Sequence, residues 1–177
     1  MKERNPDEYR EISIPPGEFR FEGCDNRLRT LLGSCVAITM WHPIKKLGGM
    51  CHFLLPTRTQ EGKSLPDPRY GDEAFDLMER AANKHLCELK EFEYKLFGGA
   101  SLLPPGTSLS RIAVGHRNIE MARGLLEKAS LKIVSEDVGG ACARTVVLDN
   151  WNGDVWVRTT QASTADPLID QELYLSV

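Results

Sequence analysis

The sequence predicts an α/β protein, a layered sandwich of mixed, largely antiparallel sheets with two main helices packed outside. Strand-like stretches rich in β-branched and aromatic residues recur along most of the chain, whereas only two stretches have helical spacing. Several strands follow one another across short turns, which favours hairpins and antiparallel pairing. The pairs Gly98-Gly99 and Gly139-Gly140 lack the spacing of a dinucleotide-binding fingerprint, so we do not expect a Rossmann fold.

The expected strands are short apolar segments bounded by glycine, proline or polar residues. Residues 12–21 alternate between apolar and polar around Pro15-Pro16-Gly17, which indicates a short edge hairpin. Residues 36–41 and 50–55 flank a polar turn, and we expect them to pair as antiparallel strands. Asn152-Gly153 is typical of a type I′ turn between the last two strands. The remaining strands are expected at residues 28–32, 92–96, 133–138, 145–148 and 155–157. Asp137 and Arg144 flank Gly139-Gly140, and we expect them to shape a hairpin and not to take part in catalysis.

Two segments are expected to be helical. The first follows a polar loop over residues 57–71, and Asp72 is expected to cap it. The second is expected to begin at Gly115 or Asn118 and to run to Lys128. The apolar residues of the first helix recur on one face, at Ala74, Leu77, Met78, Ala81, Ala82 and Leu86.

The length of 177 residues fits one domain, which would bury roughly two-thirds of its unfolded surface. We expect a charged N-terminal tail over residues 1–11, a single domain over 12–160, and a C-terminal tail on the surface over 161–177. Neither an internal repeat nor a low-complexity tract divides the chain.

The composition excludes several classes of function. A net charge of −3 does not favour nucleic acid or an acidic membrane surface as a partner. The first ten residues are densely charged, and no apolar run approaches a membrane span, so we expect a cytoplasmic protein without membrane insertion. The five cysteines contain no Cys-x-x-Cys pair, so we expect free thiols and no metal site.

Gly33-Ser34-Cys35 is the first candidate for chemistry. Glycine lets the backbone turn sharply, so that consecutive N–H groups can point into one concavity and hold a developing oxyanion. A thiol at such a point is exposed, and its thiolate form is favoured. The alternative is that Cys35 is a small buried apolar residue of a strand.

His52 is the candidate partner of Cys35. Antiparallel pairing of residues 36–41 with 50–55 sets Cys35 opposite residues 52 to 54, with the Cβ atoms of Cys35 and His52 about 5–8 Å apart. That separation allows an imidazole to bind a thiol and to activate it as a nucleophile. Cys51 would face the other side of the strand. By itself, His52 would more often be a core histidine, and Cys24, Cys87 and Cys142 have no comparable partner.

Several blocks of the chain, in order from about residue 12 to residue 157, resemble the CheD family of chemoreceptor glutamine deamidases. The two most specific blocks are Thr30-Leu31-Leu32-Gly33-Ser34-Cys35-Val36-Ala37 and Gly48-Gly49-Met50-Cys51-His52-Phe53-Leu54-Leu55-Pro56. The others are Lys95 to Ala100, Gly115 to Ile119, Asp137 to Gly140, Arg144 to Asp149, and Asn152-Gly153.

The resemblance implies a layered α/β sandwich in which Cys35 is the nucleophile and His52 its base. A threonine that orients the histidine completes the family's triad. It often stands six residues before the cysteine, where this chain has Arg29, and Thr30, five residues before, is the nearest match. The backbone at Gly33 and Ser34 would hold the oxyanion.

The resemblance also implies an activity. A receptor glutamine would be hydrolysed to glutamate through a Cys thiolate and a thioester, without a metal or organic cofactor. The substrate would be the helical cytoplasmic part of a methyl-accepting chemoreceptor, with the phosphatase CheC as a further partner. Gly98 and Gly99 would let a substrate segment approach closely, or would simply form a tight turn. The alternatives are a non-catalytic receptor- or CheC-binding adaptor, and methyl-ester hydrolysis or transglutamination by the same pair.

Overall fold

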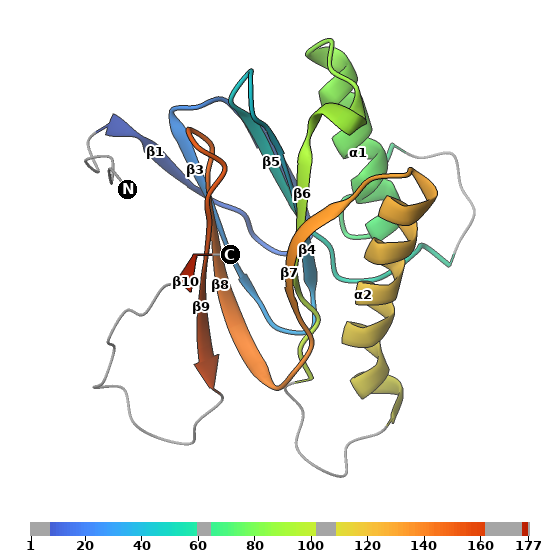
Figure 1. The fold of residues 1–177 in the computed structure, drawn as a ribbon. Coiled ribbons are helices and arrows are strands. Elements are labelled where there is room, and N and C mark those ends of the chain that lie inside the picture. Colours follow the sequence, from blue (N-terminus) through green and yellow to red (C-terminus); the bar gives the residue numbers. More distant parts are fainter. Residues whose placement is uncertain (1–7, 60–64, 102–108, 162–174, 177) are drawn as a thin grey trace.

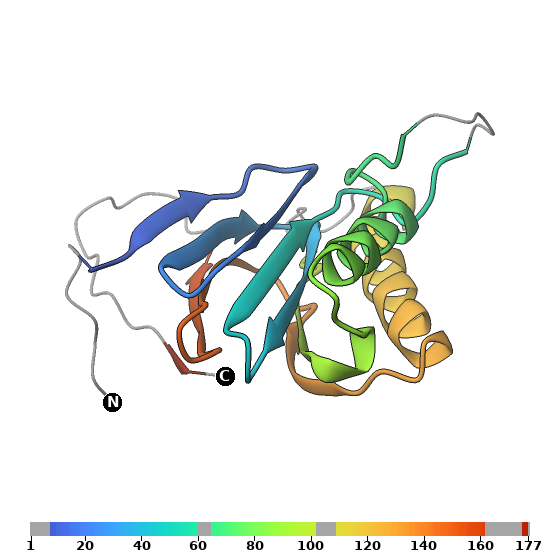
Figure 2. The same ribbon diagram turned by 90° about the horizontal axis from the view of Figure 1, so that it is seen from above.

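Two sheets lie face to face, and two helices cover the outer face of one of them (Figures 1 and 2). The computed structural model describes residues 8–59, 65–101, 109–161 and 175–176. The predicted α/β sandwich of mixed, largely antiparallel sheets with two helices outside is confirmed. Among the helices of these residues, none combines the length and apolar character that a bilayer crossing requires.

The first sheet has the order β1-β3-β8-β9-β10. Its first strand runs parallel to β3, and the other neighbours are antiparallel. Its strands are β1 (Arg10–Ser13), β3 (Asn26–Leu32), β8 (Cys142–Asp149), β9 (Val155–Gln161) and β10 (Leu175–Ser176). Arg10 and Glu11, which the sequence analysis assigned to a tail, therefore belong to β1, and Leu175 and Ser176 add a strand beside β9.

The second sheet has the order β2-β5-β4-β6-β7, with only β6 and β7 parallel. Its central strands are buried on both faces, because the first sheet covers one side and the helices cover the other. Its strands are β2 (Glu18–Glu22), β5 (Leu47–His52), β4 (Val36–His42), β6 (Glu93–Gly98) and β7 (Ile133–Val138).

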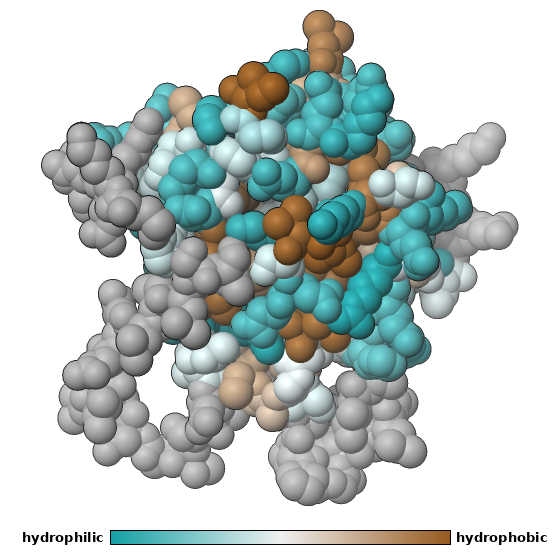
Figure 3. Space-filling model, in the orientation of Figure 1, coloured by the Kyte–Doolittle hydropathy of each residue, from teal (hydrophilic) through white to brown (hydrophobic). Residues whose placement is uncertain are grey.

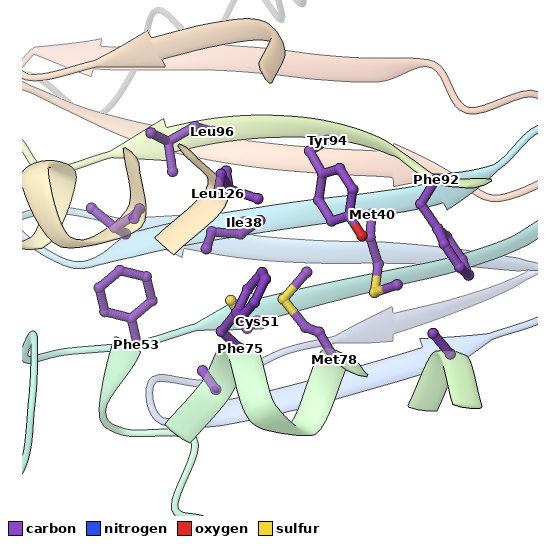
Figure 4. Close-up of a cluster of buried hydrophobic side chains, with 14 of the residues drawn as sticks. Ile38, Met40, Cys51, Phe53, Phe75, Met78, Phe92, Tyr94, Leu96 and Leu126 are labelled. Atoms are coloured by element: carbon purple, nitrogen blue, oxygen red, sulfur yellow. The ribbon is translucent and has the colours of Figure 1, made fainter. Parts of the chain in front are cut away.

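Alternation along β4 divides the core into two layers. Val36, Ile38 and Met40 pack towards the helices in a cluster with Phe53, shown in Figure 4. Ala37 faces the other way, into the layer between the sheets. From outside, hydrophilic residues cover most of the face in Figure 3, and apolar residues gather near its centre.

The helices are α1 (Gly71–Lys84) and α2 (Leu109–Lys128), with a short 3₁₀ helix, η2 (Leu89–Glu91), between them. The prediction that Asp72 caps α1 is wrong: the N-cap is Tyr70, and Asp72 lies in the first turn, where it accepts the N–H of Glu73 at 2.9 Å. Leu86 was predicted on the buried face, but it follows the helix end and is 89% exposed. Helix α2 begins at Leu109, earlier than Gly115 or Asn118.

The predicted hairpin over residues 12–21 is also wrong. Strand β1 pairs in the first sheet and β2 in the second, so Pro15-Pro16-Gly17 carries the chain from one sheet to the other. Packing explains the separation: Ile14 is buried between the sheets, whereas Phe19 packs in the layer beneath the helices.

The connection from β8 to β9 is not the expected type I′ turn. That turn needs positive φ at both central residues, but of Asn152 and Gly153 only Gly153 has it, at 81°. The N–H of Gly153 closes the connection on the carbonyl of Asp149 at 2.8 Å. Gly153 lies against the ring of Trp41, where a Cβ atom would overlap the indole.

We predict that Gly153→Ala lowers the free energy of unfolding by about 2–4 kcal/mol, through backbone strain together with overpacking against Trp41. Gly139→Ala is the matched control, because Gly139 has a similar φ of 76° and nothing within 4 Å of its Cβ position. It should cost only about 1 kcal/mol, from strain alone. Urea unfolding measures both values, and equal losses would contradict the role of the Trp41 contact.

Candidate active site

The loop Gly33-Ser34-Cys35 joins β3 of the first sheet to β4 of the second. It lies at the end of the sandwich where β6 ends and β7 turns into β8 (Figure 1). Three donors hold its carbonyl groups: the N–H of Ala100 binds Gly33 at 2.9 Å, Nδ2 of Asn118 binds Ser34 at 3.2 Å, and the N–H of Gly99 binds Cys35 at 2.7 Å.

The N–H groups of the same loop are differently placed. Within the part of the chain that the structure describes, neither Ser34 nor Cys35 donates its N–H to a backbone carbonyl. In a trans peptide the C=O and N–H point in opposite directions, so carbonyls fixed on one side leave the N–H groups on the other. Cys35 is partly buried beside these donors. Such a loop can bind an anion that forms next to the sulfur.

His52 ends β5, on the strand beside β4, and the predicted antiparallel pairing of these strands is confirmed. An isolated bridge between Val36 and Phe53 lies in the same register, three residues beyond the pair Thr39 and Met50. Cys35 precedes Val36 and His52 precedes Phe53, so the two residues are diagonal neighbours that share one face. Cys51 lies on the opposite face, in the layer beneath the helices (Figure 4), where burial raises the pKa of its thiol to about 12.

Thr30 of β3 lies across the layer between the sheets and meets the ring of His52. Its Oγ1 is 2.7 Å from Nδ1 of His52 and donates to the carbonyl of Ile14 at 2.7 Å. A hydroxyl group has one proton, and here it goes to Ile14, so Nδ1 must be the donor in the contact with Oγ1. The neutral ring therefore has its lone pair on Nε2, the nitrogen that a general base needs.

Burial sets the charge state of the pair. His52 is 1% exposed, and burial lowers the pKa of its ring to about 4, against the smaller opposing effect of the Ile14 carbonyl. Burial also raises the pKa of the Cys35 thiol, which its own backbone N–H partly offsets. Both side chains are therefore neutral at pH 7, and the expectation of an exposed Cys35 with a favoured thiolate is wrong, because the thiol is partly buried. Nε2 of His52 is buried and has no hydrogen-bond partner among the described residues, so no bond joins it to the sulfur in this structure.

Sequence comparison identifies the relatives of this chain. The family model described as CheD chemotactic sensory transduction matches residues 54–159. A protein of Pseudomonas syringae pv. tomato, named Probable chemoreceptor glutamine deamidase CheD, is 44% identical over 84% of this chain and 88% of its own. Relatives from Dechloromonas aromatica and Maridesulfovibrio salexigens are 40% and 35% identical, over 91% and 88% of this chain and 94% and 95% of their own.

The chain belongs to the CheD family. The family-model match begins after Cys35 and His52, but a continuous span of 84% of the chain necessarily includes both. The CheD relationship therefore extends over the strands that carry the candidate pair.

In this CheD protein, Gly98 and Gly99 lie against the cysteine loop. Both have positive φ, at 102° and 70°. A Cβ on Gly98 would overlap the carbonyl oxygen of Cys35, and one on Gly99 would overlap Ile119 of α2. These contacts explain why the structure needs glycine at both positions. A role of Gly98 and Gly99 in substrate approach stays a prediction.

Two further groups at this end of the CheD sandwich were not predicted to belong to the site. The carbonyl of Ile14 fixes the proton of Thr30, and the amide of Asn118 holds the Ser34 carbonyl. Asn118 falls within a block of the family resemblance, which was the only signal for it. The expected hairpin at Asp137 and Arg144 is wrong, because β7 and β8 lie in different sheets.

Arg144 instead shapes the crossing between those sheets. Its guanidinium donates to the carbonyl of Gly139 and to the carboxylate of Asp137, both at 2.8 Å. The Gly139-Gly140 turn packs against the end of β6, since the N–H of Gly139 donates to the carbonyl of Gly98 at 2.8 Å. The crossing therefore supports the segment that holds the cysteine loop.

Among the described residues, one group of side chains brings metal-ligating atoms close together. His42, Cys87 and Glu91 place them within 4.8 Å of one another, away from Cys35. Nδ1 of His42 accepts the N–H groups of Ile44 and Lys45, at 3.2 and 3.3 Å, so its neutral ring carries the proton on Nε2. The ammonium of Lys45 also lies 3.2 Å from the sulfur of Cys87. A protonated ligand atom and a competing cation do not fit a divalent metal ion.

The lowered pKa of His52 predicts a pH-dependent loss of stability. Below pH 6.5 the unfolded chain binds a proton at His52, whereas the folded chain does not until about pH 4, so unfolding becomes more favourable across this window. The difference should reach about 3 kcal/mol. Urea unfolding between pH 7 and pH 4 should therefore show a steeper loss for the wild type than for His52→Gln. Parallel curves would mean that His52 titrates alike in both states.

Proposed function

We propose that this protein hydrolyses glutamine side chains of chemoreceptors to glutamate, with Cys35 as the nucleophile and His52 as the base. The hydrogen bond between Thr30 and His52 supports this reading most strongly, because it leaves the lone pair on Nε2 of a histidine that shares a face of the sheet with Cys35. The names of the relatives, chemoreceptor glutamine deamidases, supply the substrate class.

The first half of the reaction forms a thioester. Nε2 of His52 takes the proton of the Cys35 thiol as the sulfur attacks the side-chain carbonyl carbon of glutamine. The N–H groups of Ser34 and Cys35 bind the oxyanion, which stabilises the transition state by about 3–4 kcal/mol per donor. The protonated ring then gives its proton to the nitrogen, the C–N bond breaks, and ammonia leaves.

The second half regenerates the enzyme. His52 takes a proton from water, the hydroxide attacks the thioester carbonyl, the C–S bond breaks, and the protonated ring returns its proton to the sulfur. The products are glutamate and the free thiol. The chemistry needs neither a metal ion nor an organic cofactor.

The sulfur of Cys35 and Nε2 of His52 must come within hydrogen-bonding distance before they react. Burial favours the neutral thiol and neutral imidazole, and Nε2 has no hydrogen-bond partner in the part of the chain that the structure describes. Catalytic hydrogen bonds are often long without substrate and shorten in the complex. We therefore infer that a bound glutamine brings the sulfur and Nε2 together and that the thiolate forms only then.

The proposed substrate is the helical cytoplasmic region of a methyl-accepting chemoreceptor, and the proposed location is the cytoplasm. A deamidated glutamine gains a negative charge and becomes a carboxylate that can be methylated. The phosphatase CheC is proposed as a further partner.

We predict that Cys35→Ala abolishes deamidation while leaving the fold intact. The measurement is mass spectrometry of a receptor cytoplasmic fragment, which reveals the conversion of amide to acid. Cys142→Ala is the matched control, because Cys142 is also a partly buried free thiol. It should retain full activity. An active Cys35→Ala variant would rule out the proposed nucleophile.

We predict that Thr30→Val lowers kcat by about tenfold or more, because His52 loses the partner that fixes its tautomer, and a general base contributes about 10²–10⁴-fold. Valine keeps the shape of threonine and removes only the hydroxyl. Thr30→Ser, which restores the hydroxyl, should recover most of the activity. If valine and serine give equal rates, Thr30 does not act through His52.

The products separate the proposed reaction from its alternatives. Deamidation releases ammonia, methyl-ester hydrolysis releases methanol, and an adaptor releases neither. An adaptor would also bind the receptor equally well after Cys35→Ala, without any change in receptor mass.

A further inference from the structure

Asn118 of α2 connects the two segments that carry Cys35 and His52. Its side chain is fully buried, and Nδ2 donates to the carbonyl of Ser34 at 3.2 Å and to that of Leu54 at 2.9 Å. Ser34 directly precedes the candidate nucleophile, and Leu54 follows the candidate base by two residues. One amide therefore uses both of its hydrogens across the site.

The amide stands where the strand pairing ends. Val36 and Phe53 exchange the last pair of backbone hydrogen bonds, at 3.1 and 3.0 Å. Beyond them the strands separate, and the N–H of Leu54 turns to the carbonyl of Arg69 at 2.9 Å. The carbonyl of Ser34 thus receives its hydrogen from Asn118 and not from β5.

The contact with Ser34 controls the direction of the Cys35 N–H. Both groups belong to the same trans peptide, so they point in opposite directions. With the carbonyl held towards α2, the N–H faces the side on which the oxyanion would form. Backbone groups hold the carbonyls of Gly33 and Cys35, but a side chain holds that of Ser34, so one substitution can release it.

We propose that Asn118 is a positioning residue that fixes the Cys35 N–H as an oxyanion donor. This inference rests on the proposed role of Cys35 as an acyl-accepting nucleophile. It differs from a purely structural role, in which Asn118 would only attach α2 to the sheet. Packing already attaches that helix, because Ile119, Ala122 and Leu126 are buried in the helix-facing core.

Two reactions of the Cys35 thiol distinguish these roles. Acylation by p-nitrophenyl acetate passes through a tetrahedral oxyanion and needs the donor, whereas alkylation by iodoacetamide forms no oxyanion. In the acylation, the sulfur bonds to the acetyl carbon, the ester C–O bond breaks, p-nitrophenolate leaves, and the thiol proton passes to His52. The ratio of the two rates therefore isolates oxyanion binding from thiol access and reactivity. Cys35→Ala supplies the background for both reagents.

Asn118→Ala should lower the acylation rate of Cys35 about 10- to 100-fold, approaching the loss caused by removing an oxyanion donor, and should change alkylation less than about threefold. On a receptor fragment, kcat should fall with little change in KM. Asn150→Ala is the matched control: Asn150 is also fully buried, and its Nδ2 donates to the carbonyls of Glu22 and Gly23, at 3.1 and 3.2 Å. It should leave both rates unchanged.

An equal fall in acylation and alkylation, or unchanged acylation, would overturn the inference. If Asn118→Ala does not fold, Asn118→Leu keeps a similar side-chain size, has no donor hydrogens and gives the same test. The ester needs no receptor. A wild type that is acylated but never deamidates a receptor would therefore refute the proposed function and still decide the role of Asn118.

Discussion

The site depends on one constraint: the chain leaves the first sheet after Leu32 and enters the second at Val36. Three residues make this crossing, so their peptides cannot pair in either sheet as strand residues do. Their carbonyls are satisfied instead by Gly99, Ala100 and Asn118, while the N–H groups of Ser34 and Cys35 bind no backbone carbonyl of the described residues. Buried backbone carbonyl groups need hydrogen-bond donors as partners. Because these donors bind the carbonyl side of the peptides, the loop presents its N–H groups on the other side.

The same crossing explains why His52, the candidate base, comes from one sheet and its partner Thr30 from the other. Strand β3 carries Thr30 just before the crossing, and β5 carries His52 in the facing sheet. The distance of 2.7 Å between Oγ1 and Nδ1 thus depends on how closely the two sheets pack. Small apolar residues of the intervening layer, such as Ala37, therefore affect the base although they carry no chemistry.

Local sequence patterns predicted the features that depend on residues close together in the sequence. The pairing of β4 with β5 followed from two apolar stretches around a polar turn, and with it the shared face of Cys35 and His52. The same reasoning failed at Pro15-Pro16-Gly17 and at Gly139-Gly140, where a hairpin and a crossing between sheets have the same local signature. Only packing with distant strands separates the two outcomes.

Contacts between side chains and carbonyls were the least predictable part. The sequence offers Thr30 as the nearest match to a family threonine, but its proton goes to Ile14, sixteen positions away, which no spacing rule reveals. Asn118 is similar, since its partners are two carbonyls that any residue type could supply. Sequence patterns record side-chain chemistry, whereas these contacts depend on where the backbone runs.

The neutral resting state follows from the same burial that forms the site. An exposed Cys–His pair could exist as thiolate and imidazolium, but a site closed between two sheets penalises both charges. Ionisation then requires something that stabilises charge at the moment of attack, and the N–H groups of the crossing loop are suited to that. A thiol that stays protonated until substrate arrives also avoids reaction with small electrophiles, because the thiolate is the reactive form. The fold thus keeps the thiol of Cys35 unreactive without substrate, and it also supplies the N–H groups that stabilise the charge formed during attack.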